Sequence, residues 1–271
     1  GFIMDNRPIG IFDSGLGGLT VLREIRKLLP KESLIYFGDN GRAPYGTKSR
    51  ETIIKFTRQI VSFLLSQDVK LLVVACNTSS ALALPELKPS IHVPVLEVIE
   101  PGSISALKKT RTGRIGIIAT PATISSGVYS KAILQRDPGV KVFPKACPLF
   151  VSLVEEGWWD NEITRMVATE YLSELKNEDI DTLVLGCTHY PLLSETIRKV
   201  MGDELVQVSS AEELALALKK MLAEKSLHTE ATGAHYHYFT SDSVEKFKKL
   251  GKMILGEEID PVEKVDLDCV V

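Results

Sequence analysis

The chain has 271 residues, of which 44% are hydrophobic, and a formal net charge of −3. A charge this close to balance excludes the basic excess typical of nucleic-acid-binding proteins, so no nucleic acid is expected as a partner. No apolar run approaches the roughly 20 residues that a membrane-spanning helix needs. The segment 1–5 also lacks the charged and apolar regions of a signal peptide. We therefore expect a cytoplasmic protein that does not associate with membranes.

Strand and helix patterns alternate along the first hundred residues. Continuous apolar runs predict four strands, at 8–12, 34–37, 71–75 and 95–98. Between them, apolar residues recur at helical spacing over 19–29 and 53–64. This alternation is typical of an α/β fold, in which helices cover a parallel sheet.

The pattern restarts near residue 114 and indicates an internal duplication. The apolar run at 114–120 resembles the run at 8–14, with Ile115 lying 106 residues after Ile9. A second pair of runs ends in Cys76 and Cys187, which are 111 residues apart. A repeat this long predicts two similar domains rather than a solenoid. Each would hold a mostly parallel sheet flanked by helices, and the two would be related by pseudo-two-fold symmetry.

The domain boundaries follow from this repeat. We expect a first domain over 1–98 that is completed by 208–271, and a second domain over 99–207. The last part of the chain carries a strand pattern at 205–208, a helical pattern at 211–223 and an alternating segment at 235–239. On a strand, His235 and His237 share one face and could form a ligand pair. With no third ligand nearby in the sequence, an exposed strand face is the favoured interpretation.

Cys76 and Cys187 mark the predicted active site. Ligands of open parallel sheets bind beyond the carboxyl ends of the strands, and a cleft between two such edges suits a small molecule. Two thiols close together do not both ionise readily, because the first charge opposes the second. One thiolate and one thiol supply a base and an acid, as a proton transfer on two faces of one carbon requires.

Three turns rich in hydrogen-bond donors accompany these cysteines. The segment 13–18 opens a helix and can bind an anion such as a carboxylate, but its glycines do not match a dinucleotide or phosphate motif. The turns 77–80 and 188–191 also open helices, and each alone is explained as a helix cap. His189 is placed to assist Cys187 as a hydrogen-bond partner or proton relay. Asp13 could orient a thiol or pair with a substrate ammonium.

Other uses of cysteine fit the sequence less well. The chain has four cysteines without a Cys-x-x-Cys pair, so neither a disulfide framework nor a metal site is expected. Cys147 and Cys269 are interpreted as small buried apolar residues. A cysteine hydrolase based on Cys187 and His189 leaves Cys76 without a role. Thiol redox chemistry needs a resolving partner that the motif spacing does not offer.

Four motifs resemble those of the glutamate racemases, in the order and spacing of that family and within a similarity that covers nearly the whole chain. They are Ile9-Gly10-Ile11-Phe12-Asp13-Ser14-Gly15-Leu16-Gly17-Gly18, Pro44-Tyr45-Gly46, Ala75-Cys76-Asn77-Thr78 and Leu185-Gly186-Cys187-Thr188-His189-Tyr190-Pro191-Leu192-Leu193. The segments 119–123 and 154–157 fit the same pattern. The family belongs to the cofactor-independent aspartate/glutamate racemases. The resemblance implies an isomerase that interconverts L- and D-glutamate without PLP or another cofactor, supplies D-glutamate for peptidoglycan, and forms a homodimer.

The resemblance also implies roles for individual residues. Cys76 and Cys187 resemble the two catalytic acid/base residues, and Asp13, Glu155 and His189 resemble the helpers that tune the thiols. Thr120 is expected to contact a substrate carboxylate. The full substrate-binding set that the family pattern implies is Asp13, Ser14, Tyr45, Gly46, Asn77, Thr78, Thr120, Thr188 and His189.

Two other functions remain open. A racemase of another small acid, such as aspartate, would carry nearly the same cysteine motifs. A non-catalytic binding protein for acidic amino acids would give the paired cysteines no role. The chain departs from the family at 209–211, where Ser-Ser-Ala replaces Asp-Ser-Gly, so no functional residue is expected there. The pair Trp158-Trp159 could cover the cleft, form a subunit contact or belong to a domain core.

Overall fold

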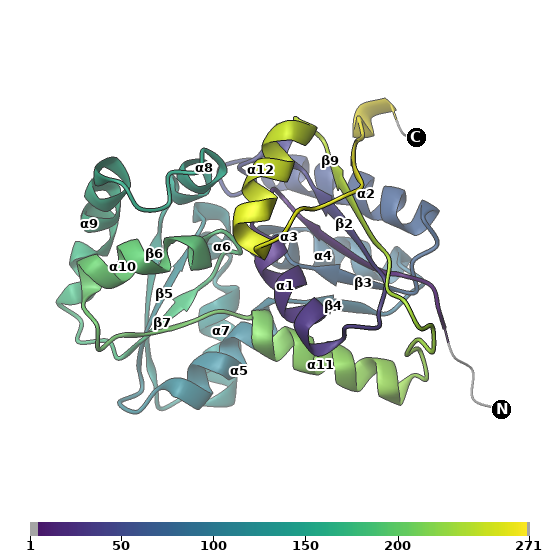
Figure 1. Ribbon diagram of the computed structural model, residues 1–271. Helices are drawn as coiled ribbons and strands as arrows, with labels where there is room; N and C mark the ends of the chain where they lie inside the picture. Colours follow the sequence, from purple (N-terminus) through teal and green to yellow (C-terminus); the bar gives the residue numbers. More distant parts are fainter. Residues whose placement is uncertain (1–4, 270–271) are drawn as a thin grey trace.

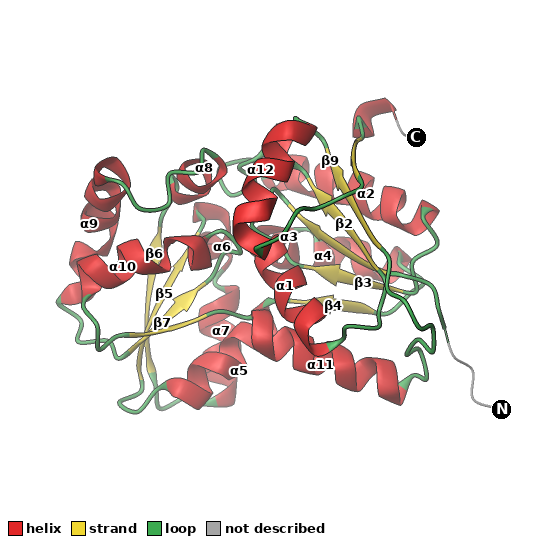
Figure 2. Ribbon diagram, in the orientation of Figure 1, coloured by secondary structure: helices red, strands yellow, loops and turns green. Residues whose placement is uncertain are grey.

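Two parallel sheets form the framework of the protein, as seen in a computed structural model that describes residues 5–269. The expectation about a signal peptide rests largely on residues 1–4, which lie outside this range. The first sheet has the order β10-β9-β2-β1-β3-β4 and the second the order β6-β5-β7-β8. Figures 1 and 2 show the two sheets side by side, each with helices around it. The predicted α/β fold with two domains is confirmed.

The strands of the first sheet are β1 (Ile9–Asp13), β2 (Leu34–Gly38), β3 (Leu71–Val74), β4 (Val95–Glu97), β9 (Tyr236–Thr240) and β10 (Val262–Lys264). Those of the second are β5 (Arg114–Ala119), β6 (Lys141–Ala146), β7 (Thr182–Leu185) and β8 (Val206–Val208). The four strands predicted in the first hundred residues are confirmed. The central strands β1, β2 and β3 are buried throughout, which explains their continuous apolar sequence.

The two sheets repeat one strand order. The series β2-β1-β3-β4 of the first domain matches β6-β5-β7-β8 of the second, and every neighbouring pair is parallel. β3 and β7 therefore occupy equivalent positions, which agrees with the repeat seen in the sequence. β9 and β10 extend only the first sheet, beyond β2. The boundaries after residues 98 and 207 stay a prediction.

Helices cover both faces of the first sheet. Strand residues alternate between its faces, so Ile9 and Ile11 join one core cluster while Phe12 joins the other. The first cluster includes side chains of α1 (Leu19–Leu28), α11 (Ala211–Glu224) and α12 (Val244–Leu255). The second includes those of α2 (Arg50–Ser66) and α4 (Leu84–Leu87). The remaining helices of this domain are α3 (Asn77–Leu82), η1 (Asn40–Arg42), η2 (Lys88–Ser90) and η4 (Leu267–Cys269).

The second sheet is covered in the same way. Its helices are α5 (Ile99–Lys109), α6 (Pro121–Ser126), α7 (Val128–Arg136), α8 (Phe150–Glu155), α9 (Glu162–Lys176), η3 (Tyr190–Leu193) and α10 (Ser194–Met201). α11 packs against α1 of the first domain and α5 of the second. It buries Leu214, Leu218 and Leu222, which share one face at a spacing of four residues. This helix ties the two domains together on the side visible below α1 in Figure 1.

Several sequence interpretations change in the structure. His235 precedes β9 and is exposed, while His237 pairs with Glu263 at 2.7 Å, so the two histidines do not form a ligand pair. Cys147 is buried as expected, but Cys269 is exposed because it lies in η4 near the described end of the chain. No helix within residues 5–269 has the length and apolar character needed to cross a membrane.

Candidate active site

Cys76 and Cys187 lie just beyond the equivalent strands β3 and β7. Both side chains are buried, with 4% and 7% of each residue exposed. Cys76 is the N-cap of α3, and its Sγ accepts a hydrogen bond from the backbone N–H of Ser79 at 3.4 Å. Figure 2 shows β3 and β4 with their arrowheads toward the second domain, so this edge of the first sheet faces the second domain. The structure thus brings one thiol from each domain to the contact between them.

An imidazole–carboxylate pair adjoins Cys187. Nδ1 of His189 lies 3.8 Å from Sγ of Cys187, and Nε2 lies 2.8 Å from Oε1 of Glu155. A carboxylate oxygen only accepts, so the hydrogen of the second contact lies on Nε2. Nδ1 is therefore the atom that exchanges a hydrogen bond with the thiol. This row of three side chains can stabilise a thiolate at Cys187 through an imidazolium.

Asp13 joins the same cluster from the end of β1. Its Oδ1 accepts a hydrogen bond from the Thr188 hydroxyl at 2.9 Å, and its Oδ2 accepts one from the N–H of Gly15 at 3.0 Å. Oδ2 also lies 3.9 Å from Nδ1 of His189. Asp13 is fully buried, so these contacts are its substitutes for water. It fixes Thr188 and the start of the glycine loop in relation to His189.

The glycine loop at 13–18 binds a carboxylate of the protein itself. The backbone N–H of Leu16 donates to Oε1 of Glu155 at 2.9 Å. A methyl group added at Gly15 would lie 1.7 Å from that same oxygen, so the absence of a side chain there lets Glu155 reach the loop. The sequence predicted that this loop accepts an anion, but it did not indicate that the anion belongs to α8.

The local environment shifts the pKa values of these groups in different directions. Burial, and then the charge of Asp13, raise the pKa of Cys76 to about 12. Burial also raises the pKa of Asp13, and the His189 charge opposes this shift. For His189 burial disfavours the charge, but the contacts with Cys187 and Glu155 outweigh it and raise the pKa well above 6.5. The two thiols therefore have unlike surroundings: Cys76 is kept protonated, and Cys187 faces an imidazolium.

The expected substrate-binding residues surround the thiols on both domains. The hydroxyl oxygens of Thr78 and Thr120 lie 2.7 Å apart across the domain contact. The carbonyl of Gly46 accepts a hydrogen bond from Ala122 at 3.0 Å, which brings the loop at 44–46 to the same place. Ser14, which directly follows β1, and Asn77, the first residue of α3, are buried nearby. These groups lie where the two domains meet. The Thr78 and Thr188 hydroxyls, which are expected to bind substrate, form hydrogen bonds with residues of the other domain.

Four side chains that the sequence did not single out support this site. Asp39 accepts hydrogen bonds from Tyr45 and from the Ser241 hydroxyl, and Tyr129 donates to the side-chain oxygen of Asn77. Thr123 bonds to the Thr78–Thr120 pair, and Asn40 donates to Glu155. Asp39 and Asn40 directly follow β2, so the rule that selects polar residues at carboxyl strand ends would have found these two. Tyr129 and Thr123 lie within helices, where their spacing gives no such signal.

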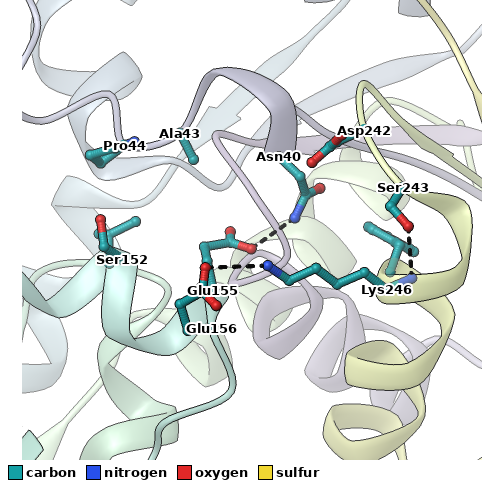
Figure 3. A pocket seen from close by; sticks show the side chains of 11 residues that line it. Asn40, Ala43, Pro44, Ser152, Glu155, Glu156, Asp242, Ser243 and Lys246 are labelled. Carbon is teal, nitrogen blue, oxygen red and sulfur yellow. Dashed lines mark hydrogen bonds and ion pairs between the residues drawn. The ribbon is translucent and has the colours of Figure 1, made fainter.

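A small cavity opens beside the Glu155 carboxylate. It has a volume of about 210 Å³ and lies between η1, α8 and the start of α12. Asn40 and Glu155 lie on one side of it, and Lys246 crosses it toward Glu156 at 3.6 Å, as Figure 3 shows. Trp158 and Trp159 are not among its lining residues. Trp158 is 43% exposed, and Trp159 packs against the core and donates to the Val154 carbonyl.

One strand order recurs in the two domains, and a thiol lies at the same strand end in each. One acid/base group from each side suits an enzyme that handles protons on two faces of one carbon. Amino-acid racemases are enzymes of this class. The family model described as Asp/Glu/Hydantoin racemase matches residues 9–213. The chain belongs to this family, and it is a racemase, an isomerase, by that relationship.

Relatives and solved structures agree with this assignment. A glutamate racemase of Geobacter metallireducens is 50% identical over 264 residues, which cover 97% of this chain and 98% of the relative. One from Syntrophus aciditrophicus is 47% identical and covers 96% of this chain and 97% of its own. The crystal structure of a glutamate racemase isoform from Bacillus anthracis superposes with a TM-score of 0.92 at 42% identity, covering 97% of this chain and 98% of that one. A Francisella tularensis glutamate racemase in complex with D-glutamate has a TM-score of 0.90 at 41% identity, covering 97% and 99%.

Proposed function

We propose that this protein interconverts L- and D-glutamate by a two-base proton transfer at Cα, with Cys76 and Cys187 as the acid/base pair. In this proposal the reaction uses no cofactor and no metal. The protein is a cytoplasmic homodimer, and the D-glutamate that it makes is used for peptidoglycan synthesis. The observation that carries it is the equivalence of β3 and β7, because each strand delivers one thiol to the contact between the domains.

The unlike surroundings of the two thiols support different starting roles, one as the base and the other as the acid. We assign the starting thiolate to Cys187, because its Sγ lies 3.8 Å from Nδ1 of His189, and the starting thiol to Cys76, because burial raises its pKa to about 12. The thiolate takes the Cα proton and becomes a thiol, while the opposite thiol gives its proton to the other face of Cα and becomes a thiolate. One proton leaves the substrate and one enters it, so the product is the opposite enantiomer and the enzyme holds the reversed pair. The reverse reaction restores the first state.

The hydroxyl and amide groups of both domains suit the charge that develops during this reaction. Removal of the Cα proton moves negative charge onto the substrate carboxylate. Asn77, Thr78 and Thr188 supply donors beside the two cysteines, and buried donors that are already oriented stabilise such charge most effectively. Asp13 is placed to face the substrate ammonium. Both thiols are buried and the Thr78–Thr120 bond joins the domains near Cys76, so we expect the domains to separate when substrate enters.

Glutamate is favoured over aspartate as the substrate. Relatives at 45–50% identity over nearly the whole chain are glutamate racemases, and solved structures of two others contain D-glutamate or L-glutamate. The aspartate racemase of Picrophilus torridus is only 21% identical with a TM-score of 0.54, which supports a shared fold. Aspartate is therefore the alternative substrate to include in the assay.

The direct test is an exchange experiment without added cofactor. The purified protein is incubated with L-glutamate in D2O, and a parallel sample receives L-aspartate. We expect D-glutamate that carries deuterium at Cα, and much slower change in the aspartate sample. Absence of both Cα exchange and D-glutamate would contradict the racemase proposal, and faster turnover of aspartate would contradict the choice of substrate.

The two-base mechanism is tested by replacing one cysteine at a time with serine, which exchanges the thiol sulfur for oxygen. Cys76→Ser and Cys187→Ser should each lower kcat by about 100-fold or more, because loss of a positioned acid or base has effects of that order. Cys147→Ser is the matched control, since Cys147 is also buried but its Sγ hydrogen-bonds to the Lys145 carbonyl and not to a proposed catalytic residue. A Cys76 or Cys187 variant with the turnover of the control would contradict the assignment.

A further inference from the structure

We infer that Asn40 is a positioning residue of the Cys187 side of the site, because its amide holds the Glu155 carboxylate against His189. The expected effect on turnover rests on the proposed function. The role of Asn40 in holding Glu155 and His189 does not depend on that function and can be tested separately. It concerns a residue of η1 in the first domain that acts on a carboxylate and an imidazole of the second.

The contacts of Asn40 fix the orientation of its amide. Its Nδ2 donates to Oε2 of Glu155 at 2.9 Å, and its Oδ1 accepts a hydrogen bond from the Thr240 hydroxyl at 3.1 Å. Only the NH2 group can donate to a carboxylate, so the assignment of oxygen and nitrogen is unambiguous. Thr240 is fully buried at the end of β9 and is itself held in place by the sheet. Figure 3 shows the Asn40 amide directed at Glu155 across the edge of the cavity.

Within residues 5–269, Asn40 is the one hydrogen-bond partner of Oε2 of Glu155. Oε1 receives hydrogen bonds from Nε2 of His189 and from the N–H of Leu16, at 2.8 and 2.9 Å. Oε2 receives one from Asn40 and borders the cavity of about 210 Å³. With both oxygens held, the carboxylate cannot turn about its terminal bond. Without Asn40, Oε2 would face the cavity, and rotation would exchange the His189 contact for one with water.

The same arrangement links this carboxylate to closure of the domains. Two of the three donors to Glu155, Leu16 and Asn40, come from the first domain, whereas His189 and Glu155 come from the second. The imidazole–carboxylate pair is therefore fully oriented only when the domains are in contact. Asn40 couples the approach of the domains to the orientation of His189 beside Cys187.

The principal alternative is that Asn40 only fills space beside the cavity, and two substitutions separate these possibilities. Asn40→Asp keeps the size of the side chain and an acceptor for Thr240, but it places a second carboxylate against Glu155. Asn40→Ala removes both contacts. A positioning role predicts that N40D is at least as impaired as N40A, because the donor is replaced by a repelling charge. A space-filling role predicts that N40D behaves like the wild type.

Kinetics in both directions give the first readout. We expect N40A to lower kcat by about tenfold, with KM for glutamate changed by less than about threefold, since misplacement of a group near the reacting atoms mainly affects the chemical step. Lys246→Met is the matched control: Lys246 lines the same cavity, but its partner is Glu156, through an exposed pair that contributes little. K246M should keep the wild-type kcat, and thermal melting of each variant checks that it folds.

Nuclear magnetic resonance of 15N-histidine-labelled protein gives the second readout and does not depend on activity. The Nε2–H signal of His189 should exchange slowly with solvent in the wild type and in K246M, and faster in both N40A and N40D. Unchanged exchange in the folded Asn40 variants would overturn the inference. So would an N40D variant with wild-type kcat. A wild-type protein without racemase activity would instead overturn the proposed function, and the exchange data would still decide the role of Asn40.

Discussion

The hydroxyl groups of Thr78 and Thr120 lie 2.7 Å apart, although the two residues follow strands of different sheets. Thr78 belongs to α3, which begins after β3, and Thr120 is the N-cap of α6, which begins after β5. A backbone bond from Ala122 to the Gly46 carbonyl, at 3.0 Å, lies beside this contact. The two domains are thus closed over the thiols, and closure depends on a very near approach between the loop at 44–46 and the start of α6.

A methyl group at Gly46 should prevent this closure. An added Cβ would lie 2.0 Å from Cβ of Thr120, a distance that no rotamer change can relieve. The first domain can still fold, because the obstacle belongs to the second. We expect Gly46→Ala to lower kcat/KM for glutamate by about 100-fold or more, since displacements near 1 Å at a reacting centre have effects of that size. Steady-state kinetics measure the loss, and small-angle X-ray scattering should show a more open particle.

Gly233→Ala is the control for this substitution, because an added methyl there has no neighbour within 4 Å. It should match the wild type in both measurements. A Gly46→Ala protein that keeps wild-type kcat/KM would show that the close approach is not needed for turnover.

The positions of the two thiols could be predicted from the sequence because local pattern alone determines them. A continuous apolar run predicts a central strand, and residues that follow a parallel strand lie at its carboxyl edge. Cys76 and Cys187 satisfy both conditions, and the repeat makes their strands equivalent. The same local rule applies to Asp13 at the end of β1, and to Asp39 and Asn40 after β2.

Contacts between residues far apart in the sequence could not be predicted in this way. Glu155 meets Asn40 and Leu16 only because the domains pack together, and no spacing in the chain encodes that contact. β6 and β10 also escaped prediction, since they are edge strands of mixed polarity, such as Lys141–Ala146 with a proline inside it.

A buried ion pair at the opposite end of the first sheet should determine stability and not activity. Nζ of Lys70 lies 2.7 Å from Oε2 of Glu32, and their side chains are 0% and 4% exposed. Lys70 also donates to the carbonyls of Asp5 and Leu227, so it joins three segments of the chain. Lys70→Met leaves the Glu32 charge buried without its partner, which costs about 3–5 kcal/mol in comparable pairs. We expect urea unfolding to show a loss of that order, with kcat of the folded fraction unchanged.

The control for Lys70→Met is Lys252→Met, which breaks an exposed pair with Glu258 whose side chains are 57% and 75% exposed. It should change the free energy of unfolding by less than about 1 kcal/mol. Adding Glu32→Gln to Lys70→Met removes the unpaired charge and should restore part of the lost stability. If the Lys70 and Lys252 variants lose equal free energies of unfolding, burial does not make the Lys70–Glu32 pair more important for stability than an exposed pair.

Burial of the Cys76 thiol should make the protein lose stability in alkaline solution. The pKa of Cys76 is raised from 9.0 to about 12, with burial as the largest cause. Between these values the unfolded chain releases the thiol proton and the folded protein retains it. The folded state then binds more protons, so the free energy of unfolding falls as the pH rises, by about 1.4 kcal/mol per pH unit for one group. The stabilisation is fully present below pH 9 and is lost as the pH rises toward 12.

Cys76→Ser isolates this contribution, because a serine hydroxyl does not ionise in that range. Urea unfolding of the wild type and of C76S at pH 8 and pH 10.5 gives four free energies, and the effects of lysine and tyrosine ionisation cancel in the comparison. From the slope above, the wild type should lose about 2 kcal/mol more than C76S between the two pH values. Parallel losses in the two proteins would mean that the Cys76 thiol ionises as easily in the folded state as in the unfolded one. The assignment of Cys76 as the starting thiol would then lose the support of a raised pKa.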